Sequence, residues 1–385
     1  MMEQQELIPH LFRTEARKIT AVLCKYLGID HIQLAEDIAA ETFLAALEDW
    51  PYKGIPPNPV GWLYTVAKNK AKNNALRAQV FSEKVSLQIN DEASINEFEI
   101  DLSDKNIADS QLQMLFAICH PTLPVEAQIG LALRILCGFG IDEIANAFLT
   151  NKETINKRLF RAKEKLRAEK IRIEFPGKIE IDKRLSAVLT TLYLLFNEGY
   201  YAESGDSVLR EDLCLEAMRL TYMLIENEQT NQSSVNALFA LMCFHASRFE
   251  ARKNNTGEIV LYHDQDEKLW NYELIARGAY HLHKASGGDN LSKYHIEASI
   301  AYWLTNKADT SEKWENILHL HNCLLAMQYS PVAALNRTYA LAKVKGNAKA
   351  IKEAEALKLE NNPFYYTLLG ELYKPTDTEK AKQHF

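Results

Sequence analysis

The sequence predicts an all-α protein with several domains. Apolar residues recur with the helical period of 3.6 along most of the chain, and alternating β-branched runs of the kind that form strands are few. Short segments rich in proline, glycine or acidic residues interrupt this periodicity. A chain of 385 residues, 47% of them hydrophobic, is too long for one ordinary core. We therefore expect two or three helical domains that fold independently.

The interruptions predict four successive parts. Helical periodicity dominates residues 1–77 and returns over 108–172, so each range is predicted to be a small helical domain. Residues 78–107 are strongly acidic and weakly periodic, and they cannot bury enough apolar surface to order themselves, which indicates a linker. After this second domain, residues 173–385 are helical again and are predicted to form a C-terminal helical domain.

Composition excludes several classes of protein. The six cysteines lie far apart, with no CxxC pair and no Cys/His cluster at zinc spacing, which is typical of a reducing compartment. No segment approaches the roughly 18 uninterrupted apolar residues that a membrane span needs. We expect a cytoplasmic protein with no membrane segment, no metal and no other cofactor.

The first domain contains a predicted helix, from about Ala35 to Trp50, with two contrasting faces. The core-facing residues are predicted to be Ala39, Phe43, Ala46, Leu47 and Trp50. Another face carries an acidic stripe around one leucine, made of Asp37, Glu41, Leu44 and Glu48. This stripe is either simply solvated or faces a protein surface of complementary positive charge.

A second helix is predicted to follow, with Asn58 as its N-cap and Pro59 at its first position, and to run to about Arg77. Aromatic side chains interleaved with amides and cations suit stacking on unpaired bases and binding along a phosphate backbone. The candidate nucleic-acid-binding residues are Trp62, Lys68, Asn69, Lys72, Asn73 and Arg77. The alternative places Trp62 and Tyr64 in the core, with the lysines as a solvated rim.

The second domain contains a short helix, a tight turn and a basic helix. An i, i+3, i+4, i+7 apolar stripe marks Ile141–Phe148, and Thr150 with Glu153 matches the capping-box spacing that starts the next helix. Opposite the apolar stripe of that next helix lie Thr154, Lys157, Arg158, Arg161 and Lys165. This order is typical of a DNA-binding helix-turn-helix, and it stands in a chain of net charge −7. The alternative is a solvated basic face on an ordinary helix.

The last part of the chain, near 331–385, contains a tetratricopeptide-like pattern. Counted from Pro331, five residues fall on positions 4, 11, 20, 24 and 27 of such a repeat: Ala334, Leu341, Ala350, Ala354 and Leu357. A second count from Pro363 places Tyr366, Leu369, Gly370 and Tyr373 on positions 4, 7, 8 and 11. The sequence therefore predicts antiparallel helix pairs in this part.

These segments resemble sigma factors of the extracytoplasmic-function class, in the sigma-70 family. Residues similar to region 2 are Glu36-Asp37, Glu41-Thr42, Pro59, Trp62-Leu63 and Ala67-Lys68-Asn69-Lys70-Ala71. Residues similar to region 4 are Glu143-Ile144-Ala145, Arg158-Leu159-Phe160-Arg161-Ala162-Lys163 and Leu166. Cys119-His120-Pro121 and the segment 192–200 are similar to markers of a subgroup that carries a C-terminal tetratricopeptide-like domain.

The resemblance implies a partner for each surface. Region 2 of such proteins binds core RNA polymerase and opens the minus-ten element, and region 4 reads the minus-thirty-five element. Polymerase contacts are therefore expected at the acidic stripe, and promoter DNA is expected at the candidate residues of the two DNA-facing helices. A further protein partner is expected for the repeats, because repeat solenoids present concave binding surfaces.

Two other functions compete with a sigma factor. A repeat-containing helix-turn-helix regulator would bind DNA without joining the polymerase, but it has no need of the two region-2-like helices. An enzyme in the C-terminal half would need a catalytic constellation, and residues 180–385 hold no G-x-S-x-G, no phosphate-binding glycine loop and no H-E-x-x-H. We expect no enzyme activity.

Overall fold

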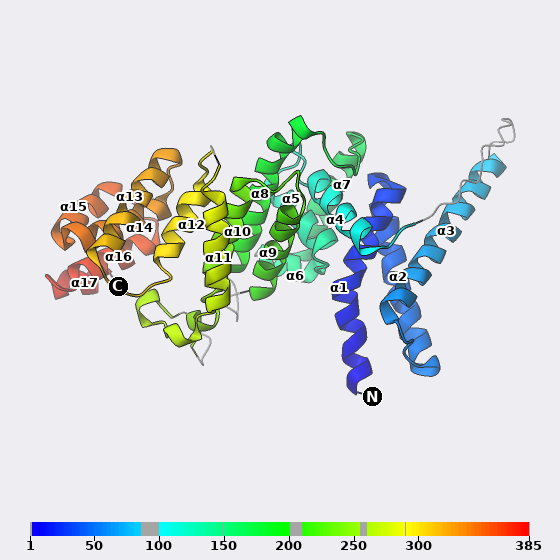
Figure 1. Ribbon diagram of the computed structural model, residues 1–385, viewed down its shortest axis with the longest axis horizontal. Coiled ribbons are helices and arrows are strands. Elements are labelled where there is room, and N and C mark those ends of the chain that lie inside the picture. Colours follow the sequence, from blue (N-terminus) through cyan, green and yellow to red (C-terminus); the bar gives the residue numbers. More distant parts are fainter. Residues whose placement is uncertain are drawn as a thin grey trace. The chain divides into compact units, whose positions relative to one another are not determined.

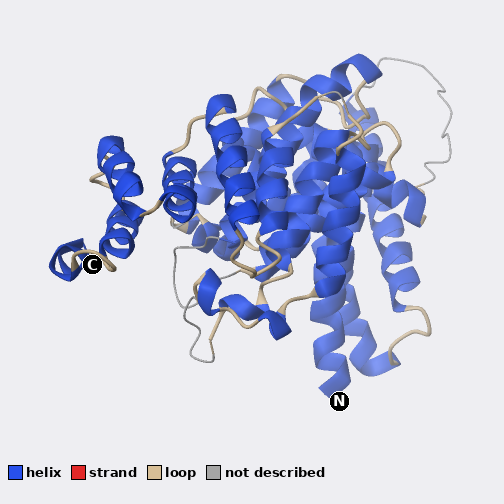
Figure 2. Cartoon of the chain, turned by 60° about the vertical axis from the view of Figure 1, so that its left-hand side comes forward, coloured by secondary structure: helices blue, strands red, loops and turns tan. Residues whose placement is uncertain are grey.

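The computed structural model describes residues 2–85, 100–148, 150–200, 210–254, 260–288 and 290–384. Every regular element in these ranges is a helix (Figures 1 and 2), so the prediction of an all-α protein is confirmed. The chain divides into two compact units, Met1–Asp206 and Ser207–Phe385. Within the described ranges, none of the helices combines the length and the apolar character needed to cross a bilayer.

The first unit contains eight α-helices and two short elements within the described residues. These are α1 (Met2–Leu27), η1 (Ile29–His31), α2 (Ile32–Lys53), α3 (Pro59–Val85), α4 (Asp104–Ile118), α5 (Val125–Leu131), the π-helical turn η2 (Ala132–Leu136), α6 (Ile141–Ala147), α7 (Lys152–Ala168) and α8 (Lys178–Tyr200). Helices α1, α2 and α3 pack against one another, and α4 packs against α1.

Helix α3 begins as the sequence predicts. Asn58 accepts a hydrogen bond from the backbone N–H of Gly61 at 2.9 Å, and Pro59 is the first helical residue. The helix continues to Val85, past its expected end at Arg77, because residues 78–85 contain neither glycine nor proline. The predicted linker therefore begins as helix, and its centre, residues 86–99, lies outside the described residues.

Helix α8 shares a core with the second predicted domain. The Thr191 hydroxyl donates a hydrogen bond to Gln128 Oε1 at 2.8 Å, and Gln128 Nε2 donates to the carbonyls of His120 and Leu123. Thr191 and Gln128 are buried, and α8 packs against α4 and α5. By its packing, α8 lies with this domain, although the boundary predicted at 173 precedes it.

The second unit is also helical throughout its described residues. Its elements are α9 (Glu211–Glu226), α10 (Ser233–Ala246), η3 (Glu250–Arg252), η4 (Tyr262–Asp264), η5 (Glu267–Leu269), α11 (Tyr272–Ala285), α12 (Lys293–Trp303), α13 (Ser311–Met327), α14 (Pro331–Lys345), α15 (Asn347–Leu357), α16 (Pro363–Tyr373) and α17 (Thr378–His384). Helix α10 is apolar on nearly every side and is almost wholly buried between α9, α11 and α12.

Helices α14 and α16 begin at Pro331 and Pro363, the two positions from which the repeat pattern was counted. Gly346, with φ of 84°, makes the sharp turn between α14 and α15. Ala350 and Ala354 are fully buried in a cluster with residues of α14 and α16. Their small side chains let these helices approach closely, which is the packing that the repeat pattern requires.

Candidate nucleic-acid interface

The acidic stripe on α2 is exposed along its whole length. Asp37, Glu41, Leu44 and Glu48 all reach solvent, and Leu44 is 53% exposed. Glu41 forms an ion pair with Lys70 of α3 at 3.1 Å. The prediction that Leu47 faces the core is wrong, because this residue is 54% exposed. It lies three residues after Leu44 and so shares the outer face of a helix whose other side is covered by α1 and α3.

The polar face of α3 contains most of the candidate residues for nucleic-acid binding. Asn69, Lys72 and Asn73 are exposed, and Lys68 is half-buried. Arg77 belongs to the helix, but its side chain lies outside the described residues. The cations and amides of α3 are therefore available along one face.

Trp62 and Tyr64 of α3 instead contact the interior of the unit. Trp62 is half-buried and packs edge-on against the buried Trp50, with ring centroids 5.5 Å apart. The Tyr64 hydroxyl donates a hydrogen bond to Glu15 Oε2 of α1 at 2.6 Å. Burial and this bond raise the pKa of Tyr64, so its hydroxyl stays protonated and keeps donating. The contacts of Tyr64 agree with the alternative that this residue belongs to the core, and those of Trp62 agree with it in part.

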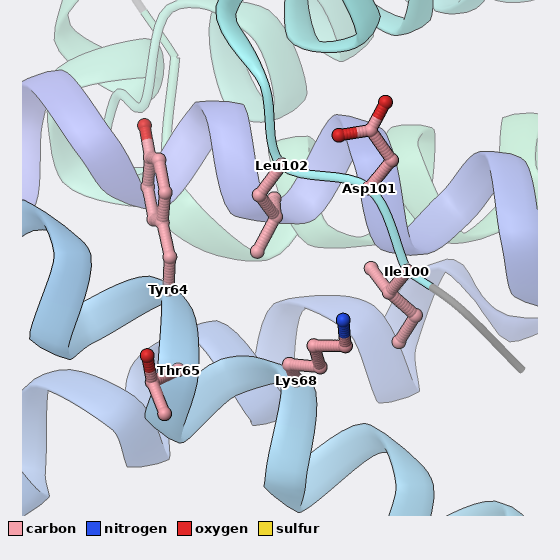
Figure 3. Close-up of a pocket in the computed structure, with 6 residues that line it drawn as sticks. All are labelled: Tyr64, Thr65, Lys68, Ile100, Asp101 and Leu102. Atoms are coloured by element: carbon pink, nitrogen blue, oxygen red, sulfur yellow. The ribbon is translucent and has the colours of Figure 1, made fainter.

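A cavity of about 520 Å³ separates α3 from the chain that enters α4 (Figure 3). Its lining residues are Tyr64, Thr65, Lys68, Ile100, Asp101 and Leu102. Figure 3 shows the Lys68 ammonium directed toward the segment 100–102. That segment is held in place by the buried Ile100 and by a hydrogen bond from the Asp101 N–H to Tyr26 Oη at 3.2 Å. The end of the predicted linker thus lies beside the candidate face of α3.

Helices α6 and α7 form the predicted short helix, turn and basic helix. The N-cap of α7 is Asn151, whose side chain accepts from the Thr154 N–H at 2.8 Å, and not Thr150 as predicted. The Thr150 N–H instead donates to the Ala145 carbonyl at 2.9 Å, so Thr150 closes the preceding turn. A one-way capping contact from a glutamate lies at α6, where the Gly140 N–H donates to Glu143 Oε2 at 2.6 Å.

The basic face of α7 is exposed, with one exception. Thr154, Lys157, Arg161 and Lys165 reach solvent, and the opposite face buries the predicted apolar stripe Ile155, Leu159, Ala162 and Leu166. Arg158 is half-buried and lies over the ring of Phe148, at 5.2 Å from its centroid. Its Nη1 is buried without a hydrogen-bond partner among the described residues. Arg158 therefore packs against the turn, while Arg161 points outward.

The contacts of Glu36 were not predicted from the sequence. Its Oε1 accepts from Arg134 Nε of η2 at 3.0 Å, and its Oε2 accepts from Lys163 Nζ of α7 at 2.6 Å. No local pattern signals this cluster, because its members are 98 and 127 residues from Glu36 along the chain. The cluster joins the helix of the acidic stripe to the helix of the basic face.

Ser233 and His295 of the second unit resemble a nucleophile with its base. Ser233 Oγ and His295 Nε2 are 2.7 Å apart. However, His295 Nδ1 accepts from the Ser292 N–H, so Nε2 carries the proton of the neutral ring. Ser233 Oγ donates to the Ala285 carbonyl at 2.7 Å and accepts from His295, so the pair does not activate the serine. No group of three or more metal-ligating side chains was found among the described residues.

Comparisons with known proteins bear on both units. Residues 11–80, which span most of α1, α2 and α3, match the model of sigma-70 region 2, and residues 184–286 match a family of unknown function, DUF6596. The uncharacterized protein R00370 of Rhizobium meliloti (strain 1021) is 34% identical over 352 residues, 89% of this chain and 82% of that protein. No solved structure matches the chain. The chain therefore belongs to the same family as this Rhizobium meliloti protein, and its N-terminal sigma-70 region 2 domain supports a sigma factor of the sigma-70 family.

Proposed function

We propose that this chain is a sigma factor of the extracytoplasmic-function class, which binds core RNA polymerase and directs initiation at particular promoters. The observation that carries the proposal is the exposed acidic stripe on α2, inside the segment that matches sigma-70 region 2. Exposed carboxylates grouped around the exposed leucines 44 and 47 suit a basic protein surface with an apolar centre. The stripe is the proposed polymerase-binding surface.

Two surfaces are proposed to bind promoter DNA. The face of α3 with Lys68, Asn69, Lys72 and Asn73 lies near the melted strand, and Arg77, a candidate from the sequence, follows on the same helix. Helices α6 and α7 act as a helix-turn-helix in which Thr154, Lys157, Arg161 and Lys165 face the major groove. Arg158 supports the turn from its position over Phe148. The hypothesis of a regulator that does not join the polymerase is disfavoured by the region 2 match.

The C-terminal unit is proposed to bind a protein partner or to modulate activity. The support is architectural, since α14 and α16 start consecutive helix pairs that share a core. Because α8 packs into the first unit, a truncation that tests this role should end in the segment 201–209, after α8. A protein truncated at 180 would lose the buried Thr191 contact and would confuse folding with regulation.

In vitro transcription tests the proposal most directly. Purified protein and core polymerase, incubated with a library of promoter fragments from the source genome, should yield transcripts that neither component produces alone. Removal of the second unit after α8 should change transcript yield without abolishing polymerase binding. If the full chain neither binds core polymerase nor directs initiation from any fragment, the sigma-factor function is wrong.

A further inference from the structure

The short turn η4 is bound to other parts of the second unit through polar side chains. The Tyr262 hydroxyl donates to the Asn306 carbonyl at 3.1 Å and accepts from Lys313 Nζ at 3.0 Å. His263 Nε2 lies 2.5 Å from Tyr339 Oη of α14, so these two side chains share a hydrogen bond. Turn η4 therefore lies on a surface formed by the loop before α13 and by α13 and α14.

Apolar packing is a minor part of this contact. None of the three residues of η4 is buried, and Leu261, directly before the turn, is 66% exposed. The ring of Tyr262 stacks on Trp270, and the Lys313 ammonium lies over it at 5.2 Å from its centroid. A turn held mainly by polar and cation–π contacts leaves its surface at a smaller cost than a buried apolar segment does.

The surface beneath η4 carries positive charge that few contacts neutralise. Lys307 Nζ donates to backbone carbonyls of the segment 263–265 at 2.8 and 2.5 Å. Lys313 is only 2% exposed, and its Nζ donates to a hydroxyl and a backbone carbonyl. Lys343 of α14 forms an ion pair with Asp309 at 3.1 Å, whereas Lys307 and Lys313 form none with a described residue. Two of the three lysines therefore bind only neutral oxygens.

A carboxylate would bind these two lysines more strongly than the present acceptors do, because charge-assisted hydrogen bonds are shorter and stronger than neutral ones. Aromatic rings lie among the cations, since Lys343 Nζ is 5.4 Å from the ring centroid of Trp314 and 5.9 Å from that of Tyr339. Such a surface suits a segment that combines carboxylates with an aromatic ring. The segment that contains η4 has this composition, with one tyrosine and the carboxylates Asp264, Asp266 and Glu267.

We propose that the surface formed by Lys307, Lys313, Tyr339 and Lys343 binds an acidic, aromatic segment of a partner protein, and that η4 occupies this surface in the free chain. The proposal names the partner class of the second unit and so rests on its proposed partner-binding role. Turn η4 has the advantage of a high effective concentration, because it belongs to the same chain. The partner gains the charge-assisted bonds that η4 lacks, and it displaces η4 where this gain is larger.

Binding of a synthetic peptide tests the surface directly. A fluorescein-labelled peptide of residues 260–268 should bind the full chain weakly, because η4 is in place. It should bind the Tyr262→Ala, His263→Ala double variant roughly ten-fold more tightly, because the internal competitor is weakened. Fluorescence anisotropy measures both affinities. A peptide of the same composition in scrambled order is the control for unspecific charge attraction, and it should bind the double variant roughly ten-fold more weakly than the ordered peptide.

A milder variant covers the case in which calorimetry shows that the double variant does not fold. Tyr262→Phe keeps the ring and removes only the hydroxyl that bonds to Asn306 and Lys313. This variant should bind the ordered peptide roughly three-fold more tightly than the unmodified chain does.

Charge reversal tests the lysines. Lys307→Glu, added to the variant that binds the peptide, should lower the affinity roughly ten-fold, because like charges then oppose each other. The matched control is Lys352→Glu, the same change at an exposed lysine of α15, and it should leave the affinity unchanged. A peptide with Asp264→Asn, Asp266→Asn and Glu267→Gln should bind roughly three-fold more weakly than the ordered peptide, because it lacks the carboxylates.

The outcomes separate this surface from the sigma-factor function. Equal affinity of the unmodified and η4-weakened chains, or equal binding of the ordered and scrambled peptides, overturns the proposal. Displacement of the labelled peptide by a single-stranded DNA oligonucleotide, but not by the unlabelled peptide, also overturns it. Because no polymerase is present, a chain that binds the peptide as expected but never directs initiation loses only the sigma-factor function. Normal initiation without the expected peptide binding refutes the surface alone.

Discussion

The two compact units use their charged and polar residues in opposite ways. In the first unit, α2 and α7 present carboxylates and cations on faces that are open to solvent. In the second unit, His281, His295 and His321 are buried, and the first two bind Asn236 and Ser233. Exposed charges remain open to partners even where they form surface pairs, as Glu41 does with Lys70 and Lys157 with Glu153. Buried and bonded polar groups instead stabilise the fold. The proposed recognition surfaces thus lie in the first unit and the buried histidines in the second, although the first unit also holds a buried polar contact between Thr191 and Gln128.

The largest expected effect is at the acidic stripe. Reversing its charge with Asp37→Lys and Glu48→Lys should weaken binding to core polymerase by 100-fold or more, because like charges placed across an interface cost several kcal/mol. Fluorescence anisotropy with labelled polymerase measures the change. The matched control is Glu312→Lys in the first turn of α13, an exposed carboxylate in the second unit. Equal affinity of the stripe variant and the control would remove α2 from the interface.

Acid should destabilise the second unit more than the first. Burial lowers the pKa of His281 and of His321 to about 4, so both remain neutral in the folded second unit. The pKa of each histidine is lower in the folded protein than in the unfolded chain, where it is near 6.5. The contribution of the two histidines to the free energy of unfolding is therefore complete above pH 6.5 and is lost as the pH falls toward 4. Each buried histidine accounts for up to about 3 kcal/mol of that loss.

Hydrogen exchange measured by mass spectrometry at pH 7 and pH 4.5, corrected for the intrinsic exchange rate, reports on the two units separately. Amides of α10–α13 should lose protection at the lower pH by a larger factor than amides of α1 and α2. Carboxylate protonation affects the whole chain, so the difference between the units is the quantity to compare. Equal losses in both units would contradict the assignment of these histidines to the stability of the second unit.

Alanine substitutions of Arg158 and Arg161 on α7 should affect different properties, thermal stability for Arg158 and promoter binding for Arg161. Arg161→Ala should weaken promoter binding by about 1–3 kcal/mol and leave thermal stability unchanged, because its side chain is exposed. Arg158→Ala should instead lower the melting temperature, because it removes the contact with Phe148 at the turn. Gel-shift titration and calorimetry on both variants give the comparison. A reversed order of effects would mean that Arg158, and not Arg161, faces the groove.

The smallest expected effect is at the junction of α8 with α5. Thr191→Val removes the hydroxyl that donates to Gln128 and should cost about 1 kcal/mol or somewhat more in the free energy of unfolding of the first unit. Denaturant unfolding of the full chain measures this loss. Thr190→Val is the control, since Thr190 is a partly exposed neighbour bonded only within its own helix. Identical stability of the two variants would argue against a shared core.

The sequence by itself determined the helical class, the starts of α3, α14 and α16, and the charged faces of α2 and α7. These features follow from local periodicity and from proline and asparagine at helix starts, which act within a few residues. Only the tertiary structure decided that Leu47 is exposed, that Arg158 packs on Phe148, that α8 joins α4 and α5, and that Glu36 binds Arg134 and Lys163. Most of these outcomes depend on which distant helix covers which face, and periodicity within one segment carries no information about that choice.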